Sequence, residues 1–208
     1  MSAPTFEAVR YTPVDAIALA SFDTASLQDS IATIGEASPG LLLSGAAGSR
    51  VHDAIWNLGY EKVLSYPFGQ TAQESPPLIE VGQPLRTFEE WQRAGITPLH
   101  SDAEAGRRVL SVAVSYVGEL SLELFDWGTE GILEGANQAE VCARETARII
   151  CDKEVDIRYF SAHATSFRVS PGQCLVFDNS RPHMARSVVL PRHSISTFFR
   201  KDVEAAPY

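Results

Sequence analysis

The chain has 208 residues, of which 45% are hydrophobic and 21% charged, a composition that indicates a soluble globular protein and excludes a disordered or fibrous one. This length suits one sizeable core, so we expect a single domain over residues 1–208. The formal net charge of −9 opposes binding to phosphate backbones and to anionic lipid surfaces. We therefore expect no nucleic-acid partner and no membrane partner.

The cysteines and the first residues bear on the compartment. Cys142, Cys151 and Cys174 are an odd set without a CxxC pair, which suits neither a disulfide framework nor a zinc site. The segment MSAPTFEAVRYTP lacks a basic stretch followed by an apolar one, and the uncharged stretches of the chain are shorter than the about 20 residues that cross a bilayer. These features favour a cytoplasmic location.

The first part of the chain favours helices. Residues 14–35 carry alanines, leucines and isoleucines at three- and four-residue steps and end in Gly35, a pattern that predicts one or two short amphipathic helices. Residues 48–58 predict another. We expect this region, about residues 14–58, to lie against one side of the β-structure that follows.

The pattern then changes to that of a strand, which begins at Lys62 and ends in a turn after Phe68. Residues 72–86 are rich in proline and poor in pattern, which indicates a long loop that could act as a lid. A short helix follows, with Thr87 as its N-cap and Gly95 at its end.

The second half reads mainly as strands. Residues 108–127 predict two antiparallel strands that meet at Gly118. Residues 137–150 predict a helix whose charged residues face solvent. After it come four short strands, with turns at Pro171-Gly172 and Leu190-Pro191. Short strands at this spacing are typical of a β-sandwich or barrel.

Three side chains on this β-structure suit a metal ion. In an extended segment His100 and Asp102 lie on the same face. His183 follows the strand GQCLVFDN and is expected to open a hairpin whose return strand begins with Arg192. Two imidazoles and one carboxylate hold a divalent iron while leaving about three positions open, whereas zinc favours a closed tetrahedron.

The open positions and Arg192 together suit a 2-oxoacid. Such an acid can chelate iron at two positions and leave the last for O2. A guanidinium buried in a barrel needs an anionic partner, and the far carboxylate of 2-oxoglutarate would pair with Arg192. Ser194 and Ser196 follow on the same strand face, and of the two we prefer Ser196 as a further hydrogen-bond donor to that carboxylate.

With these residues the chain resembles the iron(II)- and 2-oxoglutarate-dependent oxygenases, most closely their prolyl-hydroxylase-like branch. The resemblance covers about residues 62–200 and includes His100-Ser-Asp102, His183, Arg192 about nine residues later, and the flanking segments VLSYPFG and PGQCLVFDNSRPH. It implies a mainly β fold with flanking α-helices, built as a double-stranded β-helix of the jelly-roll or cupin type. It also implies Fe(II) held by the two histidines and Asp102, 2-oxoglutarate held by Arg192, and Tyr66 near the co-substrate. Because Asp102 is present, it implies hydroxylation rather than halogenation.

Several points stay open at this stage. Either Ser115 or Tyr116 would face 2-oxoglutarate, depending on a one-residue choice of register. Candidates for contact with the substrate are Arg181, Trp127 and Tyr116. We expect the enzyme to be a dioxygenase that oxidises an unactivated C–H bond of a small molecule, such as an amino acid or secondary metabolite, with release of succinate and CO2. The alternatives are a prolyl-type hydroxylase of peptides or proteins, and a metal-binding cupin without oxygen chemistry, which would not need Arg192.

Overall fold

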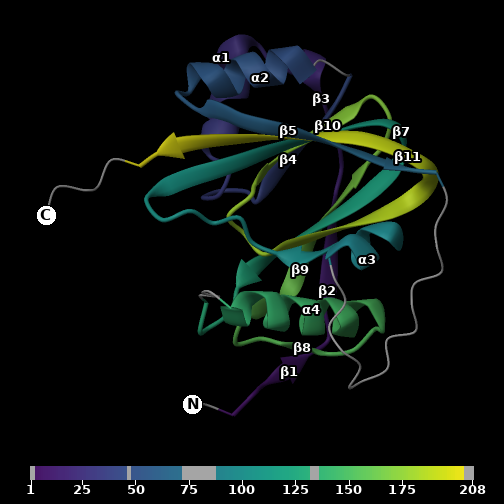
Figure 1. Ribbon diagram of the computed structural model, residues 1–208. Coiled ribbons are helices and arrows are strands. Elements are labelled where there is room, and N and C mark those ends of the chain that lie inside the picture. The colour runs from purple at the N-terminus through teal and green to yellow at the C-terminus, as the bar shows by residue number, and fades with distance from the viewer. Residues whose placement is uncertain (1–2, 46–47, 72–87, 132–135, 204–208) are drawn as a thin grey trace, which may run out of the picture.

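The structure, a computed structural model, describes residues 3–45, 48–71, 88–131 and 136–203. In this part of the chain one nine-stranded sheet curls into two layers around a shared interior, which we call the upper and the lower sheet, and helices cover their outer faces (Figure 1). A separate two-stranded sheet pairs Phe6–Glu7 with Val155–Asp156. The expected class, mainly β with flanking helices and with the curled sheet of a double-stranded β-helix, is confirmed. The strands are β1 (Phe6–Glu7), β2 (Arg10–Val14), β3 (Ile17–Ala18), β4 (Gly40–Ser44), β5 (Glu61–Gln70), β6 (Ile96–His100), β7 (Arg107–Trp127), β8 (Val155–Asp156), β9 (Phe160–Val169), β10 (Gln173–Asp178) and β11 (His183–Asp202). The helices are the 3-10 turn η1 (Leu19–Ser21) and the α-helices α1 (Thr24–Ala32), α2 (Gly48–Asn57), α3 (Phe88–Arg93) and α4 (Ala136–Ile150).

Two long strands, β7 and β11, pair with each other and run through both sheets. The first half of β7 and the second half of β11 belong to an upper sheet with the strand order β3-β4-β10-β7-β11-β5. The other halves belong to a lower sheet with the order β2-β9-β7-β11-β6. The space between the sheets is therefore lined by both halves of each long strand.

The predicted chain reversals at Gly118 and at Leu190-Pro191 are wrong, because β7 and β11 each continue as one strand through these positions. Gly118 has φ +67°, and a Cβ there would collide with the carbonyl oxygens of Val189 and Pro191. Opposite Gly118, β11 contains extra residues that have no partner in β7, as the pairs Val189↔Glu119 and His193↔Val117 show. Such a bulge bends a strand without reversing it, so the two strands pass together from one sheet to the other.

The bend also changes which residues of β7 face inward. Before Gly118 the inward side chains are those of Ser111 and Ala113, and after it those of Leu120 and Leu122. A strict two-residue alternation would put one of these pairs outside. The one-residue offset at the bend is therefore what keeps both halves of β7 turned toward the interior.

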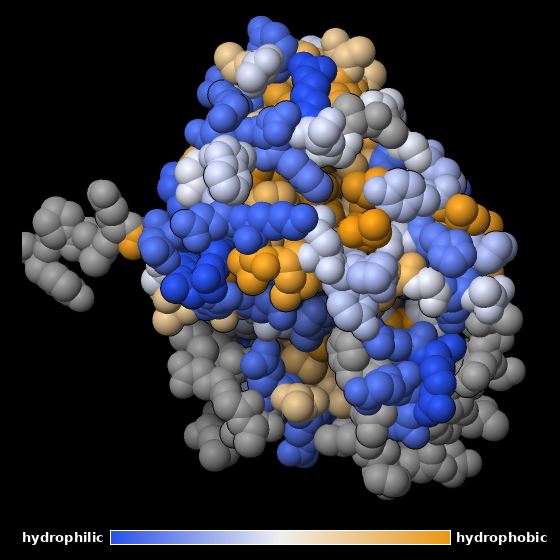
Figure 2. Space-filling view, turned by 45° about the horizontal axis from the view of Figure 1, so that its top comes forward, coloured by the Kyte–Doolittle hydropathy of each residue, from blue (hydrophilic) through white to orange (hydrophobic). Residues whose placement is uncertain are grey.

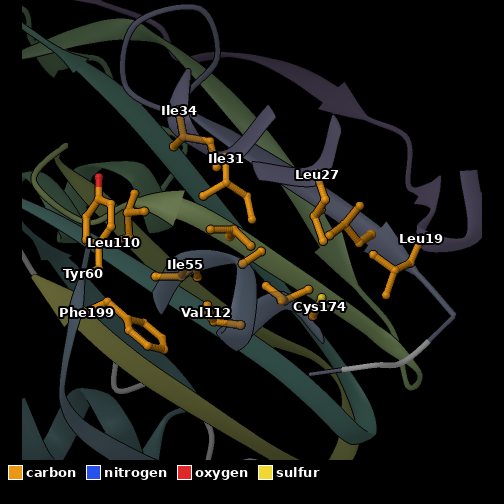
Figure 3. Packing of buried hydrophobic residues seen from close by; sticks show 14 residues of the cluster. Leu19, Leu27, Ile31, Ile34, Ile55, Tyr60, Leu110, Val112, Cys174 and Phe199 are labelled. Atoms are coloured by element: carbon orange, nitrogen blue, oxygen red, sulfur yellow. The ribbon is translucent and has the colours of Figure 1, made fainter. Parts of the chain in front are cut away.

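Three apolar clusters hold the layers together. In the first, α1 and α2 pack on the outer face of the upper sheet, and Figure 3 shows Leu27 and Ile31 of α1 and Ile55 of α2 directed at Val112 of β7. The second lies between the sheets, and the third joins the lower sheet to α4. The N-terminal helices thus lie where the sequence indicated, although residues 14–35 hold strand β3 and η1 as well as α1.

The later helices lie where the sequence predicted them, but one charged side chain that was expected to face solvent is buried. Helix α3 ends before Gly95, whose φ is +79°, as predicted. Helix α4 was predicted to expose its charged residues, yet Glu145 is fully buried, pairs with Arg144 and Arg148, and accepts a hydrogen bond from the backbone N–H of Asp156. The predicted loop and lid over 72–86 and its neighbour Thr87 lie outside the described residues.

Hydrophilic residues cover most of the face in Figure 2, with separate groups of hydrophobic residues exposed between them. Within the described ranges, no helix is both long enough and apolar enough to cross a membrane.

Candidate metal centre

His100 and His183 face each other across neighbouring strands of the lower sheet. His100 is the last residue of β6, His183 is the first of β11, and the two are direct partners in the register. Their ring centroids lie 4.2 Å apart. Pairing of β6 with β11 thus brings together two imidazoles that are far apart in the sequence.

A backbone hydrogen bond sets the orientation of each ring. Nδ1 of His100 lies 2.7 Å from the carbonyl oxygen of Pro98, and Nδ1 of His183 lies 2.8 Å from that of Arg181. Since a carbonyl can only accept, Nδ1 donates a proton in both rings, and the neutral form of each ring has its lone pair on Nε2. Burial and the neighbouring His100 hold the pKa of His183 well below its usual value, so that this ring is neutral. Neutral imidazoles with a free Nε2 are the form that binds metals.

Asp102 completes the cluster from the loop that follows β6. Its Oδ2 lies 3.8 Å from Nε2 of His100, and one candidate ligand atom from each of Asp102, His100 and His183 lies within 4.8 Å of the others. The Asp102 side chain is 42% exposed. It is held by Asn179, whose Nδ2 donates a 2.6 Å hydrogen bond to Oδ2.

The cluster opens onto a cavity between the two sheets. Histidines 100 and 183 stand on its lower wall, and the second half of β11 supplies Arg192, Ser194 and Ser196 from the upper sheet. The remaining lining is mostly apolar. It consists of Phe68, Thr97, Ser111, Ala113, Leu120, Leu122, Phe177, Asn179, Ala185 and Phe198.

Arg192 is the one strongly basic side chain among these lining residues. It is only 7% exposed, and its guanidinium carbon lies 5.7 Å from the ring centroid of Phe68. Its Nε has no hydrogen-bond partner among the described residues, and burial lowers its pKa. A buried guanidinium without a carboxylate is costly, so this side chain is placed to receive an anion that enters the cavity.

The structure brings together some of the residues named from the sequence. Ser194 and Ser196 share the cavity with Arg192, as strand alternation predicted. Tyr66 is 46% exposed and lines an adjoining hollow beside Arg192 and Gln70 instead.

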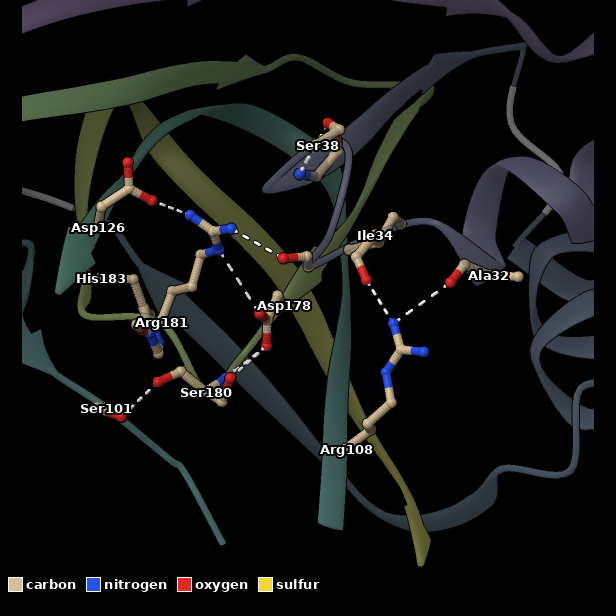
Figure 4. Close-up of polar contacts among 12 residues, drawn as sticks. Ala32, Ile34, Ser38, Ser101, Arg108, Asp126, Asp178, Ser180, Arg181 and His183 are labelled. Atoms are coloured by element: carbon tan, nitrogen blue, oxygen red, sulfur yellow. Dashed lines mark hydrogen bonds and ion pairs between the residues drawn. The ribbon is translucent and has the colours of Figure 1, made fainter. Parts of the chain in front are cut away.

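Four other candidates are not among the residues that line this cavity. Of the two residues left open by the register, Ser115 is buried and donates to the carbonyl oxygen of Gly118, whereas Tyr116 is 59% exposed. Arg181 lies between Asp126 and Asp178 and bonds to both (Figure 4), so its charge is already compensated. Trp127, at the end of β7, is not among the lining residues.

Sequence reasoning missed two residues of the site, Asn179 and Phe68. Asn179 follows β10 in the segment DNSRPH and touches Asp102, a contact that depends on a loop more than seventy positions earlier. The segment VLSYPFG was singled out for Tyr66, but it is Phe68, two residues on, that lines the cavity with Arg192. Alternation along β5 could have suggested Phe68, while nothing in the sequence signals Asn179.

No protein-family model and no curated protein matches the chain. Among solved structures, it is similar to AviO1 from Streptomyces viridochromogenes, with 14% identity and a TM-score of 0.38 over 76% of this chain and 59% of that one. A taurine dioxygenase from Burkholderia xenovorans has 9% identity and a TM-score of 0.45 over 97% of each chain. An oxidoreductase of the 2OG-Fe(II) oxygenase family from Burkholderia pseudomallei has 13% identity and a TM-score of 0.35 over 93% of this chain and 96% of that one. Because all three TM-scores are low, the assignment below rests on the geometry of the site itself.

Proposed function

We propose that this protein is an Fe(II)- and 2-oxoglutarate-dependent dioxygenase that oxidises a C–H bond of a small molecule and releases succinate and CO2. The observation that carries the proposal is the pairing of two features in one cavity. One wall holds a His-His-Asp cluster, and another holds the buried guanidinium of Arg192, which forms no ion pair with the described residues.

The donor set supports iron. Nε2 of His100, Nε2 of His183 and a carboxylate oxygen of Asp102 are two nitrogens and one oxygen, the combination that non-haem Fe(II) takes in open octahedral sites. The bonds from Nδ1 to backbone carbonyls hold both rings with Nε2 available. Among the described residues, the cluster of candidate ligands contains these three side chains only. A metal ion held by them would keep open coordination positions for small ligands.

The opposite wall supports a dicarboxylate co-substrate. The guanidinium of Arg192 can bind a carboxylate through two N–H groups, and the hydroxyls of Ser194 and Ser196 can donate to the same group. A 2-oxoacid with a second carboxylate can reach the metal cluster at one end and Arg192 at the other. When bound, Fe(II), 2-oxoglutarate and O2 supply the oxidising chemistry.

The chain itself contributes orientation and a dry surrounding. Leu120, Leu122, Phe177 and Phe198 line the cavity with apolar surface, which excludes water and strengthens the charge pairing at Arg192. The asymmetry of the site, with metal ligands on the lower sheet and the guanidinium on the upper, fixes the direction in which a dicarboxylate lies. Asp102, half exposed at the edge of the cluster, marks the side from which a substrate can approach.

The position of the cavity favours a small substrate. It lies between the two sheets, and part of its space must hold the co-substrate between the histidines and Arg192. An amino acid or a secondary metabolite fits what is left better than a folded polypeptide surface. Turnover with peptides alone would point to the prolyl-type alternative.

The test is incubation of the protein with Fe(II), ascorbate and carbon-labelled 2-oxoglutarate, with succinate and CO2 as readouts and a library of amino acids and metabolites as candidate substrates. We expect iron-dependent release of both products, stimulated by the true substrate. His183→Ala should give background release only. Metal binding without any release, across the library and with peptides, would favour a non-oxygenase cupin instead.

A further inference from the structure

Asn179 is not a candidate metal ligand itself, but it makes two hydrogen bonds to one, Asp102. The side-chain Nδ2 of Asn179 donates to Oδ2 of Asp102 at 2.6 Å, and the backbone carbonyl oxygen of Asn179 accepts from the Asp102 backbone N–H at 3.1 Å. The side chain of Asn179 is fully buried, whereas that of Asp102 is 42% exposed. A buried amide directly after β10 thus holds a carboxylate that stands on a loop.

We infer that Asn179 is a positioning residue, which orients the Asp102 carboxylate for the metal ion; the inference rests on the proposed metal site. A hydrogen bond from an amide to an ionised carboxylate is stronger than one between neutral groups. By engaging Oδ2, it removes most of the rotational freedom that a half-exposed aspartate on a loop would otherwise have. The carboxylate is then pre-oriented, and metal binding does not have to order it.

The orientation of the amide follows from its chemistry. The opposite orientation would set the Asn179 Oδ1 against the Asp102 carboxylate, acceptor against acceptor. With Nδ2 turned toward Asp102, Oδ1 is buried and has no partner among the described residues. Leaving a buried acceptor unpaired costs free energy, so the amide is poorly suited to a purely structural role.

The backbone around Asn179 is held by bonds that do not involve this side chain. Its N–H donates to the carbonyl oxygen of Val109. In the next residue, the backbone N–H and the Oγ of Ser180 both donate to Oδ1 of Asp178. Figure 4 shows this turn, with Ser101 bound to the Ser180 carbonyl. Replacing the Asn179 side chain therefore leaves the turn its other bonds.

The test is Mn(II) binding to the metal-free protein, followed by electron paramagnetic resonance, in the wild type, Asn179→Ala and Asn179→Leu. Loss of a partner that orients a ligand typically weakens metal affinity about 10- to 100-fold, and we expect this in both variants. Ser180→Ala is the matched control, because it removes a hydrogen bond from the same turn without touching Asp102, and its affinity should equal that of the wild type.

A second readout separates positioning from folding. Because Asn179→Leu removes the unpaired buried acceptor, the thermal midpoint of its metal-free form should equal or exceed that of the wild type, while its Mn(II) affinity falls. Co(II)-loaded protein should show a visible spectrum that changes in both Asn179 variants and not in Ser180→Ala. Equal Mn(II) affinity in all four proteins would overturn the inference and leave the proposed function standing. A fall in affinity that merely parallels a lower thermal midpoint, also in Ser180→Ala, would overturn it too. If the wild type itself binds no Mn(II), the proposed metal site fails.

Discussion

His100 and His183 are direct partners in the register of β6 and β11, and each has its Nδ1 bonded to the carbonyl oxygen of the residue two positions before it. The same local geometry therefore occurs twice, once on each strand. In both rings a backbone carbonyl thus orients Nδ1. Because the two rings are oriented in the same way, we expect the loss of either histidine to have the same effect on metal binding.

The first prediction concerns this pair. His100→Ala and His183→Ala should each reduce Mn(II) binding to background, because two remaining donors hold a hydrated divalent ion poorly. Calorimetric titration of the metal-free proteins measures this. His193→Gln changes an exposed histidine of the same strand and should bind like the wild type. Full binding by either alanine variant would remove that histidine from the site.

The second prediction concerns Arg192. Arg192→Met removes the charge but keeps much of the side-chain volume, so the ligand-free variant should be as stable as the wild type or more stable. In thermal melts, 2-oxoglutarate at 100 times its dissociation constant should stabilise the metal-loaded wild type by about 2.7 kcal/mol. The variant should lose this stabilisation at the same ligand concentration. Equal stabilisation of both proteins would argue that the co-substrate binds elsewhere.

The third prediction tests the bend that joins the two sheets. Gly118→Ala should lower the thermal midpoint strongly, because its Cβ would meet the carbonyl oxygens of Val189 and Pro191. Gly106→Ala is the control, since Gly106 also has a positive φ but its Cβ would meet nothing within 4 Å. The control should lose only the about 1–2 kcal/mol that a left-handed alanine costs. Equal losses in the two variants would mean that β11 does not press on Gly118.

The fourth prediction concerns acid. The pKa of His52 is lowered, first by burial and then by Lys62, and its Nε2 is buried without a partner among the described residues. Since the folded pKa lies below the unfolded one, the unfolded chain takes up protons first as the pH falls through about 6.5. The contribution of His52 to stability should therefore be full well above this pH and should decline as the pH falls below it.

Substitution of His52 separates its share of that decline. His52→Leu keeps apolar contact with Phe199, which His52 faces at a ring distance of 5.3 Å, and it should make urea-unfolding free energies less dependent on pH. His183, also with a lowered pKa, adds to the decline in the metal-free protein and remains in this variant. If the unfolding free energy of His52→Leu depended on pH as steeply as that of the wild type, this would contradict a lowered pKa of His52 as a cause of the decline.

The sequence predicted the site better than the path of the strands that build it. Two-residue spacing places Arg192 with Ser194 and Ser196, because strand alternation is a local property. Asp102 does lie near His100, but on the loop after β6, where Asn179 rather than strand alternation holds it. The approach of His183 to His100 depends on pairing between β6 and β11, which the motif spacing implied only through a family resemblance.

The long strands could not be predicted in the same way. Gly118 and Pro191 are ordinary signals of a chain reversal, and only the tertiary contact between them shows that each marks a bend in a continuous strand. The buried carboxylate of Glu145 was missed for a similar reason. Its neutralisation by Arg144 and Arg148 is visible in the helix, but the acceptance of the Asp156 N–H depends on how the chain returns after α4.

The most direct measurement of the central claim is calorimetric binding of 2-oxoglutarate under anaerobic conditions, with and without Fe(II), to the wild type and to Arg192→Met. The account predicts tight binding only when both the metal and the guanidinium are present, because the cavity holds the two ends of the molecule on opposite walls. Binding of equal strength in the metal-free protein, or in Arg192→Met loaded with Fe(II), would contradict it.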